Sequence, residues 1–224
     1  MRAMTRTDFA HQLEELRGSV VLLSSMVEKA LARAVDSLTR QDVQLAQGVM
    51  QGDAAINEQR WSIEESALLI IATQQPIARD LRSIASAIHI VTDLERMADH
   101  AVGIAKIVSD IADEPLLKPL VDIPRMAEIA RGMLTDSISA YIANDAEAAR
   151  SVAERDDLVD TFYNQIYREL LTYMMADPST INRATHLLWV AHNIERIGDR
   201  ATNICERVMF AVTGEMVEVN VSRR

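Results

Sequence analysis

The chain has 224 residues, which is enough for one large domain or two small ones, and it is 49% hydrophobic but only 4% aromatic, with 7 glycines and 5 prolines. So few turn-forming residues predict an all-α protein. The formal net charge of -10 argues against nucleic acid as a main partner. A single cysteine excludes an internal disulfide and favours a reducing compartment.

The start of the chain lacks the apolar core of a secretory signal peptide. The longest apolar runs, such as residues 67–72, are too short to span a bilayer. We therefore expect a cytoplasmic protein that does not itself cross the membrane.

Caps and helix breakers divide the chain into six expected helices, three in each half. Asp42 has a side chain suited to an N-cap, while Pro76 and Pro178 end the helices before them. Short connections make successive helices antiparallel neighbours. The expected helices cover residues 8–38, 42–72, 77–112, 125–143, 145–174 and 179–212, and residues 214–224 predict a frayed or strand-like tail.

The two halves of the chain resemble each other. Residues 37–57 align without gaps on residues 140–160 at an offset of 103, and the third helices match at an offset of 100. Similarity at a long fixed period indicates duplicated units. We predict two tandem antiparallel three-helix bundles, residues 1–114 and 125–224, joined by a Pro-rich linker over residues 115–124.

Acidic residues recur at a spacing of four in the predicted helices of both halves. Like charges at this spacing share one helical face and repel each other. Counted from the proline turn of the first half, Asp53 and Asn57 lie opposite Glu95 and Asp99. The hairpin register therefore predicts that these four side chains meet.

The same register in the second half places Asp156 and Asp160 opposite Glu195 and Asp199. Four converging oxygen-bearing side chains repel unless a cation lies among them, and hard divalent or trivalent metals take such ligands. We predict one metal site in each half. The alternative is a pair of solvated helix faces on which arginines neutralise the acids, namely Arg96, Arg196 and Arg200.

Other polar side chains have weaker claims to a site. His100 and His192 are interpreted as ordinary helix-face histidines, because the matching positions of the other half hold no histidine. Cys205 is expected in the core. Asn203 extends the row of Asp199 by one turn, although Gly103 is its counterpart. A phosphate-binding glycine loop and a nucleophile elbow are both absent from the sequence.

The stretches IATQQPIARDLRSIASAIHIVTDLERMADHA (71–101) and NIERIGDRATNICE (193–206) resemble the PhoU family of phosphate-signalling regulators, and the resemblance covers nearly the whole chain. It implies two three-helix bundles that bind multinuclear metal clusters, with iron as the expected metal and zinc, manganese or magnesium as alternatives. The implied ligands are the eight residues of the two predicted sites. Asn57 and Gly103 depart from the family pattern.

The resemblance also implies a function. Such proteins are regulators without catalysis of their own, which join the phosphate-specific ABC transporter to a sensor histidine kinase and repress the phosphate-starvation regulon when phosphate is plentiful. The chain would then lie at the inner face of the membrane through its partners, as a homodimer. Two other interpretations stay open: a metal-dependent hydrolase or oxidase on a helical scaffold, and a plain helical scaffold.

Overall fold

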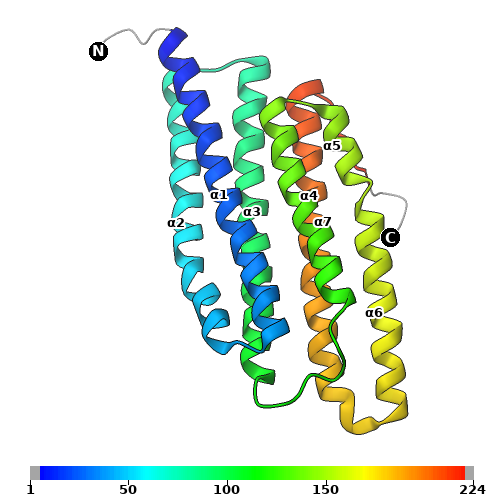
Figure 1. The fold of residues 1–224 in the computed structure, drawn as a ribbon. Coiled ribbons are helices and arrows are strands. Elements are labelled where there is room, and N and C mark those ends of the chain that lie inside the picture. Colours follow the sequence, from blue (N-terminus) through cyan, green and yellow to red (C-terminus); the bar gives the residue numbers. More distant parts are fainter. Residues whose placement is uncertain (1–5, 220–224) are drawn as a thin grey trace.

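The all-α prediction is confirmed by a computed structural model, which describes residues 6–219 (Figure 1). Residues 1–5 and 220–224, at the outer ends of the two predicted bundles, lie outside the described residues. The described helices are α1 (Arg6–Arg40), α2 (Val43–Gln74), α3 (Ala78–Ile111), α4 (Asp122–Ala143), α5 (Ala146–Ala153), α6 (Asp156–Ala176), the 3-10 helix η1 (Pro178–Thr180) and α7 (Ile181–Thr213).

The first turn of each half is built in the same way. Asp42 caps α2 by accepting a hydrogen bond from the backbone N–H of Leu45 at 2.9 Å, and Asp145, its aligned partner, caps α5. The residues just before these caps, Gln41 and Asn144, both have left-handed backbones, with φ of 53° and 52°. Matching caps and matching turns support the predicted duplication.

The prediction of one continuous helix over residues 145–174 is wrong, because Glu154 and Arg155 interrupt it and separate α5 from α6. At the break the N–H of Arg155 and the N–H of Leu158 bond to carbonyls three residues earlier, at 3.0 Å each. Arg155 is also ion-paired with Asp136 of α4. Neither Gly nor Pro marks the position, so tertiary contacts make a break that local sequence does not indicate.

Two smaller expectations also differ from the structure. Helix α4 begins at Asp122 rather than Arg125, so that Pro124 lies in its first turn, where a missing N–H costs little. Residues 214–219 form no strand.

The connection between the halves makes polar contacts with both halves. Gln41 of the first half donates a hydrogen bond to the carbonyl oxygen of Glu114 at 2.7 Å, and Arg183 of α7 lies 3.6 Å from the Glu114 carboxylate. Lys118 is buried and pairs with Glu169 of α6. The connection therefore fixes the two halves at the end of the molecule where it runs.

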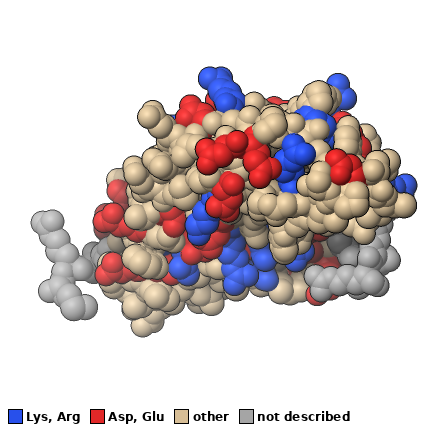
Figure 2. All heavy atoms as spheres, turned by 90° about the horizontal axis from the view of Figure 1, so that it is seen from below, with Lys and Arg blue, Asp and Glu red and all other residues tan. Residues whose placement is uncertain are grey.

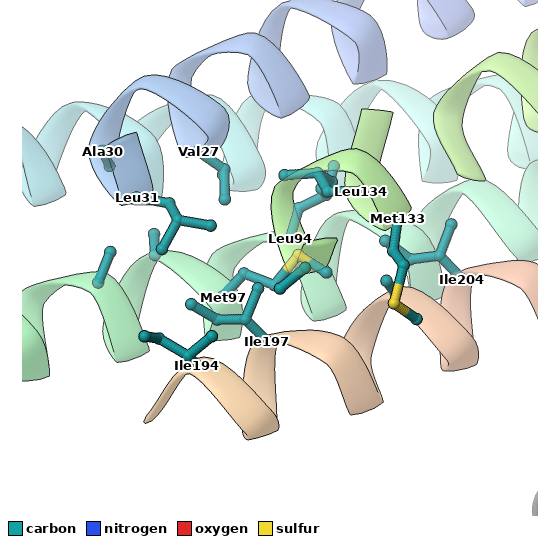
Figure 3. Close-up of a cluster of buried hydrophobic side chains, with 14 of the residues drawn as sticks. Val27, Ala30, Leu31, Leu94, Met97, Met133, Leu134, Ile194, Ile197 and Ile204 are labelled. Atoms are coloured by element: carbon teal, nitrogen blue, oxygen red, sulfur yellow. The ribbon is translucent and has the colours of Figure 1, made fainter. Parts of the chain in front are cut away.

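The two halves share one hydrophobic core. Helices α3 and α7 lie side by side at the centre and form the most extensive helix contact of the described chain (Figure 1). Figure 3 shows Leu94 and Met97 of α3 beside Ile197 of α7, with Leu31 of α1 on one side of them and Met133 of α4 on the other. Because these fully buried side chains come from both halves, the bundles are joined by packing and not by the connection alone.

Most charged side chains of the described residues lie outside this core, and Lys118 and Asp156 are buried exceptions. Figure 2 shows acidic and basic groups interleaved on the face seen from below. Within the described residues, none of the helices has a stretch that is both long enough and apolar enough to cross a membrane.

A shared core predicts that the two halves unfold together. Met97→Ala should lower the free energy of unfolding by about 2–5 kcal/mol, because it removes a fully buried side chain between the halves. Leu22→Ala, at a position that is 54% exposed, is the control and should change it little. Denaturant unfolding followed by circular dichroism checks both, and two separate transitions in the wild type would contradict the shared core.

Candidate cation sites on the two halves

The first acidic cluster consists of Asp53 and Asn57 of α2 with Glu95 and Asp99 of α3. Burial, and then the charge of Asp99, raises the pKa of Asp53. Burial and the same charge raise the pKa of Glu95. Asn57 donates a hydrogen bond to Oδ2 of Asp53 at 2.9 Å. The structure therefore brings these side chains together, as the hairpin register predicts.

The second acidic cluster consists of Asp156 and Asp160 of α6 with Glu195 and Asp199 of α7. Burial, followed by the charges of Asp199, Asp160 and Glu195, raises the pKa of Asp156 to about 7. Burial and the charge of Asp199 raise the pKa of Glu195 to about 7, and the same two causes raise the pKa of Asp160. Four carboxyls thus crowd one another more strongly than the three carboxyls of the first cluster.

The second cluster is deeper than the first because of a glycine. Asp156 is only 3% exposed, and a Cβ added to Gly198 of α7 would lie 2.9 Å from its Oδ1. The aligned residue of the first half is Ala98, opposite the half-buried Asp53. The break before α6 and the missing side chain at Gly198 together let Asp156 lie against the backbone of α7. The Gly198–Ala98 difference was a sequence signal for this depth.

The arginines neutralise the acids only in part. Arg196 lies 2.5 Å from Oδ2 of Asp199 and 3.9 Å from Oε2 of Glu195. Arg200 pairs instead with Asp93 of α3, at 3.4 Å. The alternative in which Arg96, Arg196 and Arg200 neutralise the clustered acids is therefore wrong for Arg200, whereas the positive charge of Arg96 partly offsets the raised pKa of Glu95.

Asn203 belongs to the interface between the halves and not to a row of ligands. Its amide lies 3.3 Å from Oδ1 of Asp93 and donates a hydrogen bond to it. On the other side of the interface, Nδ1 of His100 lies 3.0 Å from Oδ1 of Asn193. Both contacts join α3 to α7.

His192 lies beside the second cluster, although the sequence favoured an ordinary helix-face role. Its Nδ1 is 3.6 Å from Oε2 of Glu195, and its ring contacts Trp189 edge-on and Tyr163 at a tilt. Burial and the charge of Arg196 lower the pKa of His192. Thr92 holds the equivalent position in the first half. The two clusters therefore differ in their neighbours as well as in their acids.

Some features of the clusters fit a cation and one does not. Oδ1 of Asp53 and Oε2 of Glu195 are buried and accept no hydrogen bond, so each has oxygen lone pairs available. The donors are mostly carboxylates, which hard cations prefer. Yet over residues 6–219 no three His, Cys, Asp or Glu side chains are gathered as a ready coordination shell. Binding a cation would therefore require these side chains to rotate inward.

Fold and clusters together define a duplicated helical protein with one acidic cluster between the central helix and an outer helix of each half. A sequence model of the PhoU domain matches residues 20–108 and 123–208, one match in each half. The chain therefore belongs to the PhoU family.

Relatives and solved structures agree with this assignment. The chain is 39% identical over 218 residues to a phosphate-specific transport system accessory protein PhoU homolog from Clostridium acetobutylicum, covering 97% of this chain and 100% of that protein. A homolog from Aquifex aeolicus is 42% identical over 92% of this chain and 94% of its own. The crystal structure of PhoU from Pseudomonas aeruginosa superposes with a TM-score of 0.88 at 36% identity, over 92% of this chain and 100% of that one.

The raised carboxyl pKa values predict a dependence of stability on pH. The folded chain holds the protons of Asp156 and Glu195 more tightly than the unfolded chain, whose carboxyls titrate near pH 4. The contribution of these two carboxyls to the free energy of unfolding of the cation-free protein should therefore be largest below about pH 4 and fall as the pH rises to about 7. Asp156→Asn should reduce this fall by on the order of 2 kcal/mol.

Urea unfolding at a series of pH values in the presence of a chelator measures this slope. Asp110→Asn, at an exposed position of α3, is the matched control. A slope in Asp156→Asn equal to that of the wild type and of the control would contradict the assignment.

Proposed function

We propose that the chain is an accessory regulator of phosphate-specific transport that acts by binding and not by catalysis. The observation that carries the proposal is the similarity to phosphate-specific transport system accessory proteins over nearly the whole length of both chains. A single core uniting two acidic clusters supports a role as a binding module. The expected partners are the phosphate transporter and a sensor histidine kinase, with repression of phosphate-starvation signalling as the output.

Cations at the two acidic clusters are part of the proposal. Asp53, Glu95 and Asp99 would hold one in the first cluster, with Asn57 as a neutral oxygen donor. The four carboxylates of the second cluster would hold another. The cation, expected to be iron, would supply positive charge that offsets the repulsion between the acids. Oδ1 of Asp53 and Oε2 of Glu195, which are buried and accept no hydrogen bond, support this proposal.

Cation binding links the clusters to the outer helices. Each cluster joins a central helix to an outer helix, α3 to α2 in the first half and α7 to α6 in the second. A bound cation would replace repulsion across each seam by attraction. A partner shifts an equilibrium between two states of the protein only if it binds one state better than the other. Cation binding, by tightening the contacts of α2 with α3 and of α6 with α7, would favour the state that one partner binds better.

One observation favours the alternative of a metal-dependent hydrolase. Carboxyls with a pKa near 7, such as those of Asp156 and Glu195, are suited to general acid–base catalysis. Incubating the protein with iron, manganese or zinc and a phosphate ester tests this alternative. Turnover that Glu195→Gln abolishes would favour the hydrolase over the regulator.

The clusters should differ in cation binding. The double variant Glu195→Gln with Asp199→Asn should lose more bound metal than Glu95→Gln with Asp99→Asn, because the second cluster has one carboxylate more. Equilibrium dialysis against Fe(II) or Mn(II), followed by elemental analysis, measures the loss. Equal losses would show that Asn57 does not weaken the first cluster, and metal-free wild type would reject both sites.

Deletion of the gene should leave phosphate-starvation genes switched on in phosphate-rich medium. A promoter reporter in the deletion strain measures this, with the wild-type gene restored as the control. The deletion strain is also complemented with a variant in which the acidic residues of both clusters are neutralised. Comparison with the wild-type gene separates the role of the cations from the role of the fold alone. Normal repression in the deletion strain, where no second copy of the gene is present, would reject the regulatory function.

A further inference from the structure

Helix α2 exposes large apolar side chains on its outer face. Trp61, Leu68 and Leu69 are 61%, 59% and 60% exposed. Trp61 and Leu68 are seven residues apart and so lie on one side of the helix. The opposite side of α2 is already buried in the core through Ile63 and Ala67. The fold therefore leaves an apolar strip, defined here as Trp61, Leu68 and Leu69, that folding does not use.

The exposed charges that helix α2 itself carries beside this apolar strip are acidic. Glu58 and Glu65 are exposed, and Glu65 lies between Trp61 and Leu68 on the same side of the helix. Helix α2 contains no lysine, and Arg60, its one arginine, pairs with Glu64 at 2.9 Å. The exposed surface of α2 is therefore apolar with acidic flanks.

We propose that the apolar strip of α2 is the docking surface for a protein partner that presents an apolar cluster bordered by lysine or arginine side chains. The inference rests on the proposed function, which makes a component of the phosphate transport system the partner. A large aromatic residue next to leucines provides the kind of anchor that dominates protein interfaces. The acidic flanks match a basic border and guide its approach.

The aligned face of α6 differs, which makes the proposal specific to the first half. Leu171 aligns with Leu68 and is 41% exposed, but Asn164 takes the place of Trp61 and Arg168 that of Glu65. No tryptophan stands on that face, although Tyr167 is 45% exposed one turn before Leu171, and the charge at the position of Glu65 is positive instead of negative. The α6 face is thus a matched internal control.

Two other occupants fit the charges less well. The acidic flanks repel the anionic surface of a lipid bilayer. A second copy of this chain placed antiparallel on the apolar strip would bring the Glu65 side chains of both copies close together. A basic-rimmed protein surface satisfies both the apolar residues and the carboxylates.

The binding experiment uses the full chain and the phosphate-specific transport complex of the same organism, purified in nanodiscs. Trp61→Gln with Leu68→Gln should weaken binding by about 10-fold or more, as loss of anchor residues does. Glu65→Lys should also weaken binding and reduce its dependence on salt. Leu171→Gln with Met175→Gln on α6 should bind as the wild type does. Thermal melting confirms that each variant is folded.

Oxidative footprinting with mass spectrometry provides a second measurement on the unmodified chain. The sequence has two tryptophans, and Trp189 is 56% exposed. In the complex, oxidation of Trp61 should fall several-fold while that of Trp189 stays unchanged. Protection of Trp189 alone would overturn the proposal.

Each remaining outcome also decides the matter. Wild-type affinity in the α2 variant, or an equal loss in the α6 variant, would overturn the proposal. Binding of the wild type to protein-free anionic vesicles, if the α2 variant loses it, would also overturn the proposal. The same holds if the wild type is a dimer and the α2 variant is a monomer with unchanged affinity for the transport complex. A wild type that does not bind the transport complex would reject the proposed function, and this partner with it.

Discussion

The packing of α3 against α7 is the constraint on which the rest of the structure depends. Each is the central helix of its half, and each contributes buried residues along most of its length to the shared core. Alanines such as Ala98 and Ala101 on α3 and Ala201 on α7, all fully buried, leave room for close helix approach. Because both acidic clusters have two residues on these helices, the most firmly packed elements carry the candidate sites.

The polar contacts across this interface show how the two halves have diverged together. Asp93 forms an ion pair with Arg200 and accepts a hydrogen bond from the side-chain amide of Asn203. These charged groups lie within a largely buried seam. The related positions hold Asn193, His100 and Gly103. Here a neutral amide meets a histidine, and a Cβ on Gly103 would lie 2.8 Å from Oδ1 of Asn193. A change on one helix is thus matched on the other, so that these six positions place a single carboxylate, the half-buried Asp93, at the seam.

The sequence predicted the parts of the structure that depend on local chemistry. The caps at Asp42 and Asp145 and the register of both acidic clusters follow from side-chain type and from counting along hairpins. The break before Asp156 and the partner of Arg200 depend on residues far along the chain, so no local pattern marks them. Comparison of the two repeats suggested that Asn203, whose counterpart is Gly103, extends a row of metal ligands. Its contact with Asp93 of the other half explains this difference instead.

The second cluster can exist without a cation because it can hold protons instead. With a pKa of about 7, Asp156 and Glu195 are each roughly half neutral at that pH, and protonation removes much of the repulsion from Asp199. A cation that binds there must displace these protons, so its affinity rises with pH. Burial increases the repulsion between the carboxylates when no cation is bound. Burial therefore also makes the cation occupancy of the second cluster depend on pH. The shallower first cluster, in which Asn57 already donates a hydrogen bond to Asp53, is linked to pH more weakly.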